Sequence, residues 1–364
     1  MMKRFMLAHS ATSDWQAAVE DCLRQLPAAP PTGANLGFVY ATDYFASDLG
    51  HILRELQERT GVVHWVGSIG TAICCTAREY YDEAALAIML CEFPPHSFRL
   101  FQEPDQPGTQ QDNLQFAVVH GDPRNGQIAQ LIEQFANQNG HHYLVGGLTS
   151  SHNYYYQIAD SITEGQLSGV VFSEEVPVTT GLTQGCTPLG PVHILNDCEG
   201  HYAVHIDGRP ALDVLKEDIG EILSRDLKRI GGYIFVGFPI SGSDTGDYLV
   251  RNLVGIDPEQ GVLAIGEYLQ NGQRIMFCKR DGKSAVQDLE RMLSDIQRRL
   301  SAPPKGGLYF SCLGRGQHMF GEPSREMELI AARLGDIPLI GFYANGEIAG
   351  QRLYGYTGVL TLFL

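Results

Sequence analysis

Two short apolar segments, Leu36-Gly-Phe-Val-Tyr40 and Val62-Val-His-Trp-Val-Gly-Ser-Ile-Gly70, stand on either side of a more polar stretch. Within that stretch, four apolar residues recur at helical spacing: Leu49, Ile52, Leu53 and Leu56. A strand, an amphipathic helix and a second strand that ends in a glycine turn predict a βαβ unit with parallel strands.

The same pattern occurs three more times along the chain. The second copy begins at Phe116-Ala-Val-Val-His120, the third at Tyr233-Ile-Phe-Val-Gly237 and the fourth at Leu308-Tyr-Phe-Ser-Cys312. Between the second and third copies, residues 167–215 are rich in β-branched residues and broken by Gly-Pro turns, which is typical of antiparallel strands. We therefore expect an α/β protein of two related domains, built from βαβ units with mixed, largely parallel sheets and joined by an antiparallel connector.

This pattern predicts a division of the chain into three parts. Residues 1–32 are expected to form an N-terminal helix and a linker, because Ser13 and Gln16 make a capping box and prolines follow the helix. The first domain is expected at residues 33–230 and the second at residues 231–364.

The composition excludes several classes of protein and partner. The 364 residues carry 42 acidic and 26 basic side chains, and the net charge of −16 argues against nucleic acid and against an anionic membrane surface as partner. We expect no membrane insertion, since no apolar run is long enough to span a bilayer. The eight cysteines contain no C-x-x-C pair, and we expect a cytoplasmic protein with reduced thiols.

Six glycine-containing segments occur in a recognisable order. They are Trp65-Val-Gly-Ser-Ile-Gly70, Val145-Gly-Gly-Leu148, Gln184-Gly-Cys-Thr-Pro-Leu-Gly190, Asp207-Gly-Arg-Pro-Ala-Leu212, Phe310-Ser-Cys-Leu-Gly-Arg-Gly316 and Leu339-Ile-Gly-Phe-Tyr-Ala-Asn-Gly-Glu-Ile348. In these segments the sequence resembles FIST-domain proteins, and the two expected domains would be the FIST N-terminal and C-terminal modules.

The resemblance implies a function as well as a family. It implies an intracellular signal-transduction sensor that binds a small ligand, an amino acid being suggested, and that modulates a separate signalling protein such as a histidine kinase. Some stand-alone bacterial members resemble haem-binding sensors of nitric oxide. Haem is therefore the one cofactor that the resemblance allows, and a haem or nitric-oxide sensor is the alternative function.

Candidate ligand-binding residues lie where the predicted strands end, because ligands of parallel sheets bind beyond the carboxyl ends of strands. They are Ser68, Gly146, Gly147, Ser311, Cys312, Arg315, Gly341, Asn345 and Glu347. Glycine turns let backbone N–H groups approach a ligand, although tight packing of strand and helix explains single glycines equally well. Arg315 could bind a carboxylate and Glu347 an amino group, which would suit a zwitterion. The competing prediction for Arg315 is an ion pair with Glu347 or Glu322.

Candidate metal ligands matter only if haem is bound, and the two histidines expected to lie near the strand ends are His318 and His152. An enzyme is not expected, because the chain has no G-x-S-x-G, P-loop or H-E-x-x-H motif. A Cys-dependent enzyme is the remaining alternative. Cys312 lies close in sequence to a cation that would make its thiol more reactive, but no base for it is apparent.

Overall fold

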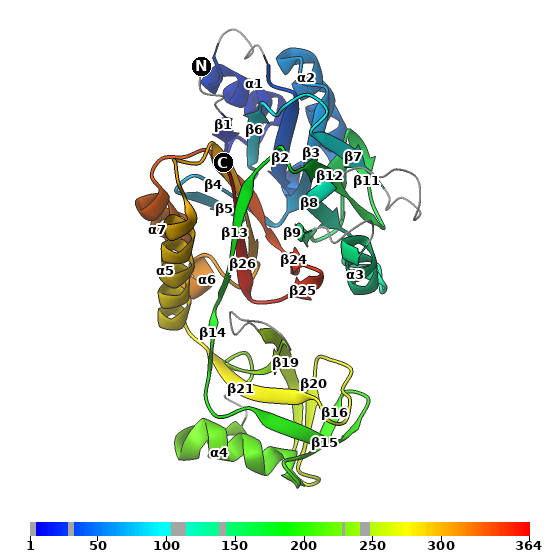
Figure 1. Cartoon of the computed structure of the whole chain (residues 1–364), viewed down its shortest axis with the longest axis vertical. Coiled ribbons are helices and arrows are strands. Elements are labelled where there is room, and N and C mark those ends of the chain that lie inside the picture. Colours follow the sequence, from blue (N-terminus) through cyan, green and yellow to red (C-terminus); the bar gives the residue numbers. More distant parts are fainter. Residues whose placement is uncertain (1–4, 28–32, 103–113, 138–142, 228–229, 241–247) are drawn as a thin grey trace. The chain divides into compact units, whose positions relative to one another are not determined.

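The computed structural model describes residues 5–27, 33–102, 114–137, 143–227, 230–240 and 248–364 (Figure 1). The chain forms two compact units. The first unit combines Met1–Gln184 with Asp288–Leu364, and the second consists of Gly185–Gln287. The second unit is thus an insertion into the chain of the first.

Three of the four predicted βαβ units are confirmed, and all three lie in the first unit. They are β2 (Leu36–Thr42), α2 (Leu49–Thr60) and β3 (His64–Gly70); β8 (Leu114–Gly121), α3 (Ile128–Asn137) and β9 (Tyr143–Leu148); and β22 (Gly306–Cys312), α7 (Arg325–Leu334) and β23 (Leu339–Ala344). In each unit the two strands pair in parallel.

The predicted third copy is wrong. Its two apolar segments form β18 (Ile234–Pro239) and β20 (Val262–Ile265), which do not pair with each other. A third strand, β19 (Tyr248–Asp257), lies between them and pairs antiparallel with both. A short apolar segment has the same pattern in a parallel and in an antiparallel strand, so the pattern alone could not separate the two arrangements.

A β-hairpin follows each parallel pair and joins the sheet of another repeat. The hairpins are β4 (Ala72–Cys75) with β5 (Arg78–Tyr81), β10 (Gln157–Ala159) with β11 (Ser161–Thr163), and β24 (Glu347–Gly350) with β25 (Arg352–Tyr354). Strand β4 pairs with β23, β10 with β3, and β24 with β9. Each repeat therefore completes the sheet of the preceding one, and the first completes the sheet of the last, so the three form a closed cycle.

The chain then returns to its own sheet, and a further strand lies at the outer edge. The returning strands β6 (Leu86–Cys91), β12 (Leu167–Ser173) and β26 (Thr357–Phe363) pair with β2, β8 and β22. The outer strands are β1 (Met6–Ser10), β7 (Phe98–Phe101) and β13 (Val178–Gln184). Each six-stranded sheet contains one parallel pair, so the expectation of largely parallel sheets is corrected: the sheets are mixed and mostly antiparallel.

One glycine in each repeat shows that the three copies are equivalent. A Cβ atom on Gly67, Gly146 or Gly341 would lie 1.7, 1.8 or 1.7 Å from the carbonyl oxygen of the paired residue on the first strand. No side chain fits at that distance. The glycines that recur in the sequence are therefore required by strand pairing.

The three first strands meet in one core. Tyr40, His120 and Phe310 follow the residues that pair with those three glycines, and their side chains contact one another. The Tyr40 hydroxyl lies 3.0 Å from Nε2 of His120, and burial lowers the pKa of His120 to about 3. His120 is therefore a neutral core residue at ordinary pH.

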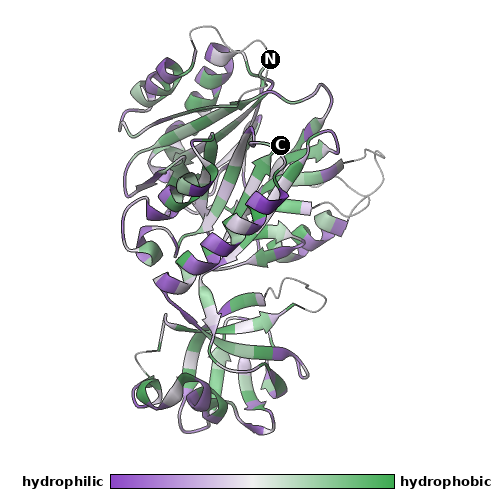
Figure 2. Ribbon diagram, turned by 60° about the vertical axis from the view of Figure 1, so that its left-hand side comes forward, coloured by the Kyte–Doolittle hydropathy of each residue, from purple (hydrophilic) through white to green (hydrophobic). Residues whose placement is uncertain are grey.

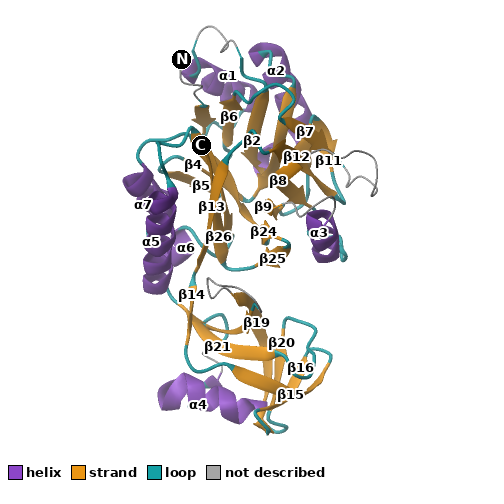
Figure 3. Cartoon of the chain, viewed as in Figure 1, coloured by secondary structure: helices purple, strands orange, loops and turns teal. Residues whose placement is uncertain are grey.

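Helices cover the outer faces of the three sheets, as Figure 3 shows. Helices α1 (Trp15–Gln25) and α2 pack on the first sheet, α3 on the second, and α5 (Gly282–Arg299) with α7 on the third. Figure 2 shows the strands mostly in apolar colours and the helices in both, as expected of amphipathic helices on a core. Within the described ranges, no helix combines the length and the apolar character that crossing a membrane requires.

The second unit is a closed six-stranded antiparallel barrel. Its strands follow one another in the order β21 (Arg274–Arg280), β15 (His193–Glu199), β16 (Tyr202–Ile206), β20, β19 and β18, and β18 pairs again with β21. Helix α4 (Ala211–Ser224) packs against the barrel core. Two short strands, β14 (Cys186–Pro188) and β17 (Arg209–Pro210), complete the sheet. The predicted connector is antiparallel as expected, and the structure divides its strands between the two units. The expected domain boundary at residue 230 stays a prediction.

Candidate functional site

The carboxyl ends of the three parallel pairs converge. Ser150, which follows β9, donates a hydrogen bond from Oγ to the carbonyl oxygen of Tyr343 at 2.5 Å. Oγ of Ser150 in turn accepts a hydrogen bond from the N–H of Thr71, which follows β3, at 3.1 Å. Asn345 N–H also donates to the Leu148 carbonyl at 2.9 Å. The chain thus places one strand end of every repeat at a common region.

Arg315, which follows β22 in this region, is completely buried and forms an ion pair with Glu326 of α7. Oε1 of Glu326 lies 2.9 Å from Nε of Arg315 and 2.7 Å from its Nη2. Glu326 also accepts hydrogen bonds from the Tyr309 hydroxyl at 2.6 Å, the Gly316 N–H at 2.9 Å and Ser311 Oγ at 3.2 Å. The ion pair expected for Arg315 exists, but its partner is neither Glu347 nor Glu322.

Glu347 is the second buried charged group at this position. Its Oε2 accepts hydrogen bonds from the N–H of Thr357 at 3.0 Å and from its Oγ1 at 2.9 Å. Burial raises the pKa of Glu347 to about 8, although Thr357, the charge of Arg315 and a hydrogen bond with Cys312 act in the opposite direction. Arg315 and Cys312 therefore both lie within interaction range of Glu347. We call Ser311, Cys312, Arg315, Glu326 and Glu347 the Arg315 cluster.

Two polar atoms of the Arg315 cluster have neither a hydrogen-bond partner nor an ion-pair partner among the described residues. They are Nη1 of Arg315 and Oε1 of Glu347, and both side chains are completely buried. The ring of Phe320, in the short helix α6 (Gln317–Phe320), lies over the guanidinium group of Arg315 at 5.3 Å. Unsatisfied buried polar atoms are rare in proteins and usually indicate water, an ion or a functional role.

Two further residues, Glu79 and Tyr81 of β5, border the Arg315 cluster. Burial and the charge of Glu326 raise the pKa of Glu79 to about 7, and the Tyr343 hydroxyl partly offsets this. A Cβ atom on Gly316 would lie 1.8 Å from the Tyr81 hydroxyl oxygen, and Gly316 has a φ of +56°. This position therefore requires glycine, which lets the chain turn directly after Arg315.

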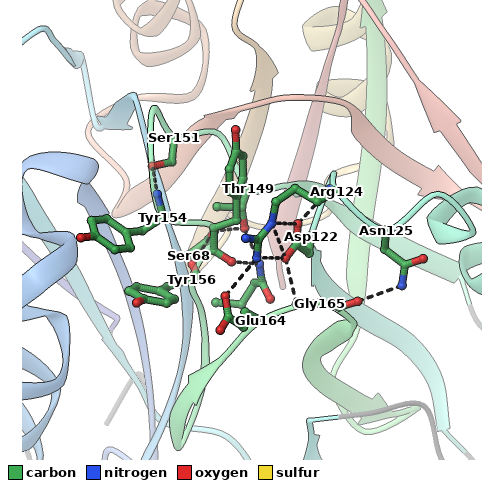
Figure 4. A network of polar contacts seen from close by, with 12 residues as sticks. Ser68, Asp122, Arg124, Asn125, Thr149, Ser151, Tyr154, Tyr156, Glu164 and Gly165 are labelled. Carbon is green, nitrogen blue, oxygen red and sulfur yellow. Dashed lines mark hydrogen bonds and ion pairs between the residues drawn. The ribbon is translucent and has the colours of Figure 1, made fainter.

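The other predicted ligand-binding residues lie apart from the Arg315 cluster or have packing contacts. Ser68 is buried, and its Oγ lies 2.8 Å from Oγ1 of Thr149 (Figure 4). A Cβ atom on Gly147 would lie 2.6 Å from that of Ala344, while Gly146 and Gly341 lie against the neighbouring strands as described above. Asn345 is exposed. Their role in ligand binding stays a prediction, and the structure gives the glycines a packing role.

A polar network at the end of β8 was not found from the sequence. Arg124 contacts Asp122 through Nε and Nη2 and lies 3.0 Å from Glu164 (Figure 4). The guanidinium group of Arg124 also lies over the Tyr155 ring, 4.9 Å from the ring centroid. Burial opposes the charge of Asp122, but hydrogen bonds from Arg124 and Gly165 lower its pKa. The sequence shows an Asp-Pro-Arg turn after a strand, but Glu164 is brought to it only by folding.

The two histidines expected for haem are exposed. The side chain of His152 is 73% exposed, and its Nδ1 lies 2.8 Å from Oδ2 of Asp43. His318 is exposed on α6 with its ring edge toward Tyr81. A proximal haem ligand normally lies in a sheltered pocket that controls access to the iron. These two positions, as the structure describes them, do not fit a bound haem.

Comparisons with known proteins give a consistent result. The model of the FIST N domain matches residues 35–209, and that of the FIST C domain matches residues 211–350. The uncharacterized protein Rv0628c of Mycobacterium tuberculosis is 32% identical over 337 residues, which covers 86% of this chain and 87% of the relative. The uncharacterized protein Mb0898c of Mycobacterium bovis is 30% identical over 362 residues, which covers 92% of this chain and 91% of the relative.

Proposed function

The chain belongs to the FIST family, whose domains are associated with sensing in signal transduction, and we propose that it senses a small polar ligand at the Arg315 cluster. The ligand would alter the activity of a separate signalling protein, such as a histidine kinase. An amino acid is the ligand class that we propose, because it carries one acceptor group and one donor group of opposite charge.

One observation carries the proposal: the Arg315 cluster contains an unpartnered donor and an unpartnered acceptor, both buried. A ligand carboxylate could accept a hydrogen bond from Nη1 of Arg315, and a ligand amino group could donate one to Oε1 of Glu347. Because Nε and Nη2 of Arg315 already contact Glu326, the carboxylate would meet one edge of the guanidinium group only.

Burial of Arg315 supports a link between binding and signalling. Phe320 covers the guanidinium group, so a ligand can reach it only if α6 and the adjoining loop move. Gly316 and Gly321 flank α6 and both have positive φ, which makes them suitable hinge positions. A ligand that favours the displaced loop would shift the population of the protein, and a partner could recognise that change.

The experiment is a thermal-shift screen of the common amino acids, followed by titration calorimetry with any that stabilise the protein. The variants are Arg315→Lys and Glu347→Gln, and the matched control is Arg124→Lys, which alters an arginine ion pair at a different strand end. We expect a ligand whose affinity falls at least about tenfold in both cluster variants and is unchanged in the control. Equal affinity in all four proteins would overturn the proposal.

Haem titration is a second arm of the same experiment. Saturable binding with a Soret band that is lost in His152→Ala or His318→Ala would support the haem alternative and contradict our proposal. Binding that neither substitution changes would leave the amino-acid proposal as it stands.

A further inference from the structure

Strand β5 places a further buried carboxyl group against α7. Glu79 and Tyr81 alternate on β5, so their side chains lie on the same face of the strand. The N–H of Glu79 donates to Ser324 Oγ at 3.0 Å, and its Oε1 accepts a hydrogen bond from the N–H of Met327 at 3.4 Å. Because Met327 directly follows Glu326, the carboxyl group of Glu79 lies against the turn of α7 that carries Glu326.

Three oxygen atoms at this position are buried and have no hydrogen-bond partner in the described part of the chain. They are Oε2 of Glu79 and the hydroxyl oxygens of Tyr81 and Tyr343. Tyr343 is completely buried, and Glu79 is 7% exposed. The rings of Tyr81 and Tyr343 lie 4.8 Å apart, and a Cβ atom on Gly316 would lie 1.8 Å from the Tyr81 hydroxyl and 3.0 Å from Cε1 of Tyr343. The two tyrosines therefore border the residue that follows Arg315.

The short helix α6 covers this position and Arg315 together. The ring of Phe320 lies over the guanidinium group of Arg315 at 5.3 Å, and the ring of His318 meets the ring of Tyr81 edge-on at 5.8 Å. A movement of α6 that admits a ligand to Arg315 would therefore uncover Tyr81 as well. The same opening offers a ligand a cationic donor and several oxygen acceptors.

The buried charges at this position do not balance. Three carboxyl groups are buried here, those of Glu79, Glu326 and Glu347. Among the residues that the structure describes, Arg315 is the only buried arginine or lysine, and it pairs with Glu326. Burial raises the pKa of Glu79 to about 7, with a contribution from the charge of Glu326, and raises that of Glu347 to about 8. Two buried carboxyl groups without a counter-ion favour a ligand that carries two cationic groups.

We propose that the ligand of the Arg315 cluster is a basic amino acid, lysine or ornithine, whose side-chain ammonium group binds to Glu79, Tyr81 and Tyr343. This inference rests on the proposed function and narrows it from amino acids in general to those with a second cationic group. An ammonium group has three N–H donors, and the three unpartnered oxygen atoms are three acceptors. The carboxylate and the α-amino group of the ligand keep the partners proposed above, Nη1 of Arg315 and Oε1 of Glu347.

Binding of a basic amino acid would release a proton from Glu79. An ammonium group pairs with the ionised carboxylate, so the ligand displaces the proton that Glu79 carries below about pH 7. An amino acid without the side-chain ammonium group leaves that proton in place. Proton release therefore distinguishes the two kinds of ligand.

The experiment compares L-lysine with L-norleucine, which has the same side chain without the ammonium group. Titration calorimetry on the full-length protein at pH 7 measures both affinities. We expect lysine to bind at least about tenfold more tightly, as hydrogen bonds to a charged group in a buried site would give. Equal affinities would overturn this inference and leave amino-acid sensing intact, whereas a screen in which no amino acid binds would overturn both.

Variants test the place of the ammonium group. Glu79→Gln should remove most of the preference for lysine and leave the affinity for norleucine unchanged, because norleucine does not contact Glu79. The matched control is Glu328→Gln, which alters a half-exposed carboxyl group of α7 and should keep the preference. A preference for lysine that survives in Glu79→Gln would refute the role of Glu79.

Proton release by the wild type gives a test that needs no variant, should Glu79→Gln not fold. Calorimetry at pH 6 in buffers of different ionisation enthalpy counts the protons released on binding. We expect lysine to release about one proton more than norleucine, since Glu79 is mostly protonated at this pH. Equal proton release by the two ligands would refute the proposal.

Discussion

Replacing Glu326 with Gln changes the charge at the centre of the Arg315 cluster and almost none of its volume. In the wild type, Glu326 and Arg315 both have fully buried side chains, and the carboxylate accepts hydrogen bonds from Tyr309 and Gly316 as well. Glu326→Gln leaves the guanidinium charge buried without its counter-ion. It also turns one acceptor into an amide NH2 group that faces other donors.

The expected cost follows from this geometry. Removing one partner of a buried ion pair destabilises a protein by about 3–5 kcal/mol, because the remaining charge is uncompensated. With a urea dependence of about 3 kcal/mol per M, the unfolding midpoint would fall by roughly 1 M or more. Circular dichroism at increasing urea concentration measures this midpoint.

The matched control lies on the same helix. Glu328 is 51% exposed and lies 3.8 Å from Arg325, whose side chain is 46% exposed, so Glu328→Gln should cost about 0–1 kcal/mol. A double replacement of Arg315 and Glu326 by Met should cost much less than Glu326→Gln alone, since no buried charge then remains. If Glu326→Gln and Glu328→Gln had the same midpoint, the reasoning about the buried pair would be refuted.

Three further predictions concern packing and pH. Gly341→Ala should destabilise the first unit by about 3 kcal/mol or more in urea unfolding, because its Cβ atom would lie 1.7 Å from a carbonyl oxygen. The control Gly50→Ala in α2 has open space around it and should stabilise the protein by about 0.5–1 kcal/mol. Equal effects of the two substitutions would contradict the strand geometry. Glu347 keeps its proton up to about pH 8 in the folded protein but loses it above about pH 4.5 when unfolded, so stability should fall as the pH rises across this range. Glu347→Gln should then be more stable than the wild type at pH 8 and equal near pH 4, and a constant difference would argue against this titration. Burial opposes the charge of His193, but hydrogen bonds with two aspartates raise its pKa above 6.5. The stability that protonated His193 adds is complete below about pH 6.5 and is lost as the pH rises through the raised pKa. In His193→Gln, the free energy of unfolding of the barrel should therefore decline less with rising pH.

The family modules and the compact units divide the chain differently. The FIST N match includes β8 and β9, and β9 pairs with β24 from the FIST C match. Conversely, β4 and β5 of the FIST N match complete the sheet of β22 and β23. Neither module therefore contains all the strands of its own sheets, and we expect neither to fold alone.

The candidate site was predicted in part. Arg315, Cys312 and Glu347 were expected near one another because each was predicted at or just beyond the end of a strand, and Arg315 and Cys312 do both act on Glu347. Glu326 was missed although it is only 11 residues from Arg315, since its contact depends on how α7 packs against the sheet. The network of Asp122, Arg124 and Glu164 was missed because a loop and a hairpin must fold together to form it.

The sequence by itself determined the local elements and the family. Helical spacing at Leu49, Ile52, Leu53 and Leu56, apolar runs and glycine turns are properties of neighbouring residues, so three βαβ units could be identified without a structure. Only the tertiary structure decided which strands pair across repeats and which buried charges meet. An apolar strand is satisfied by many partners, and a buried charge by any counter-ion that the fold brings near, so these choices depend on the free energy of the whole unit rather than on any local segment.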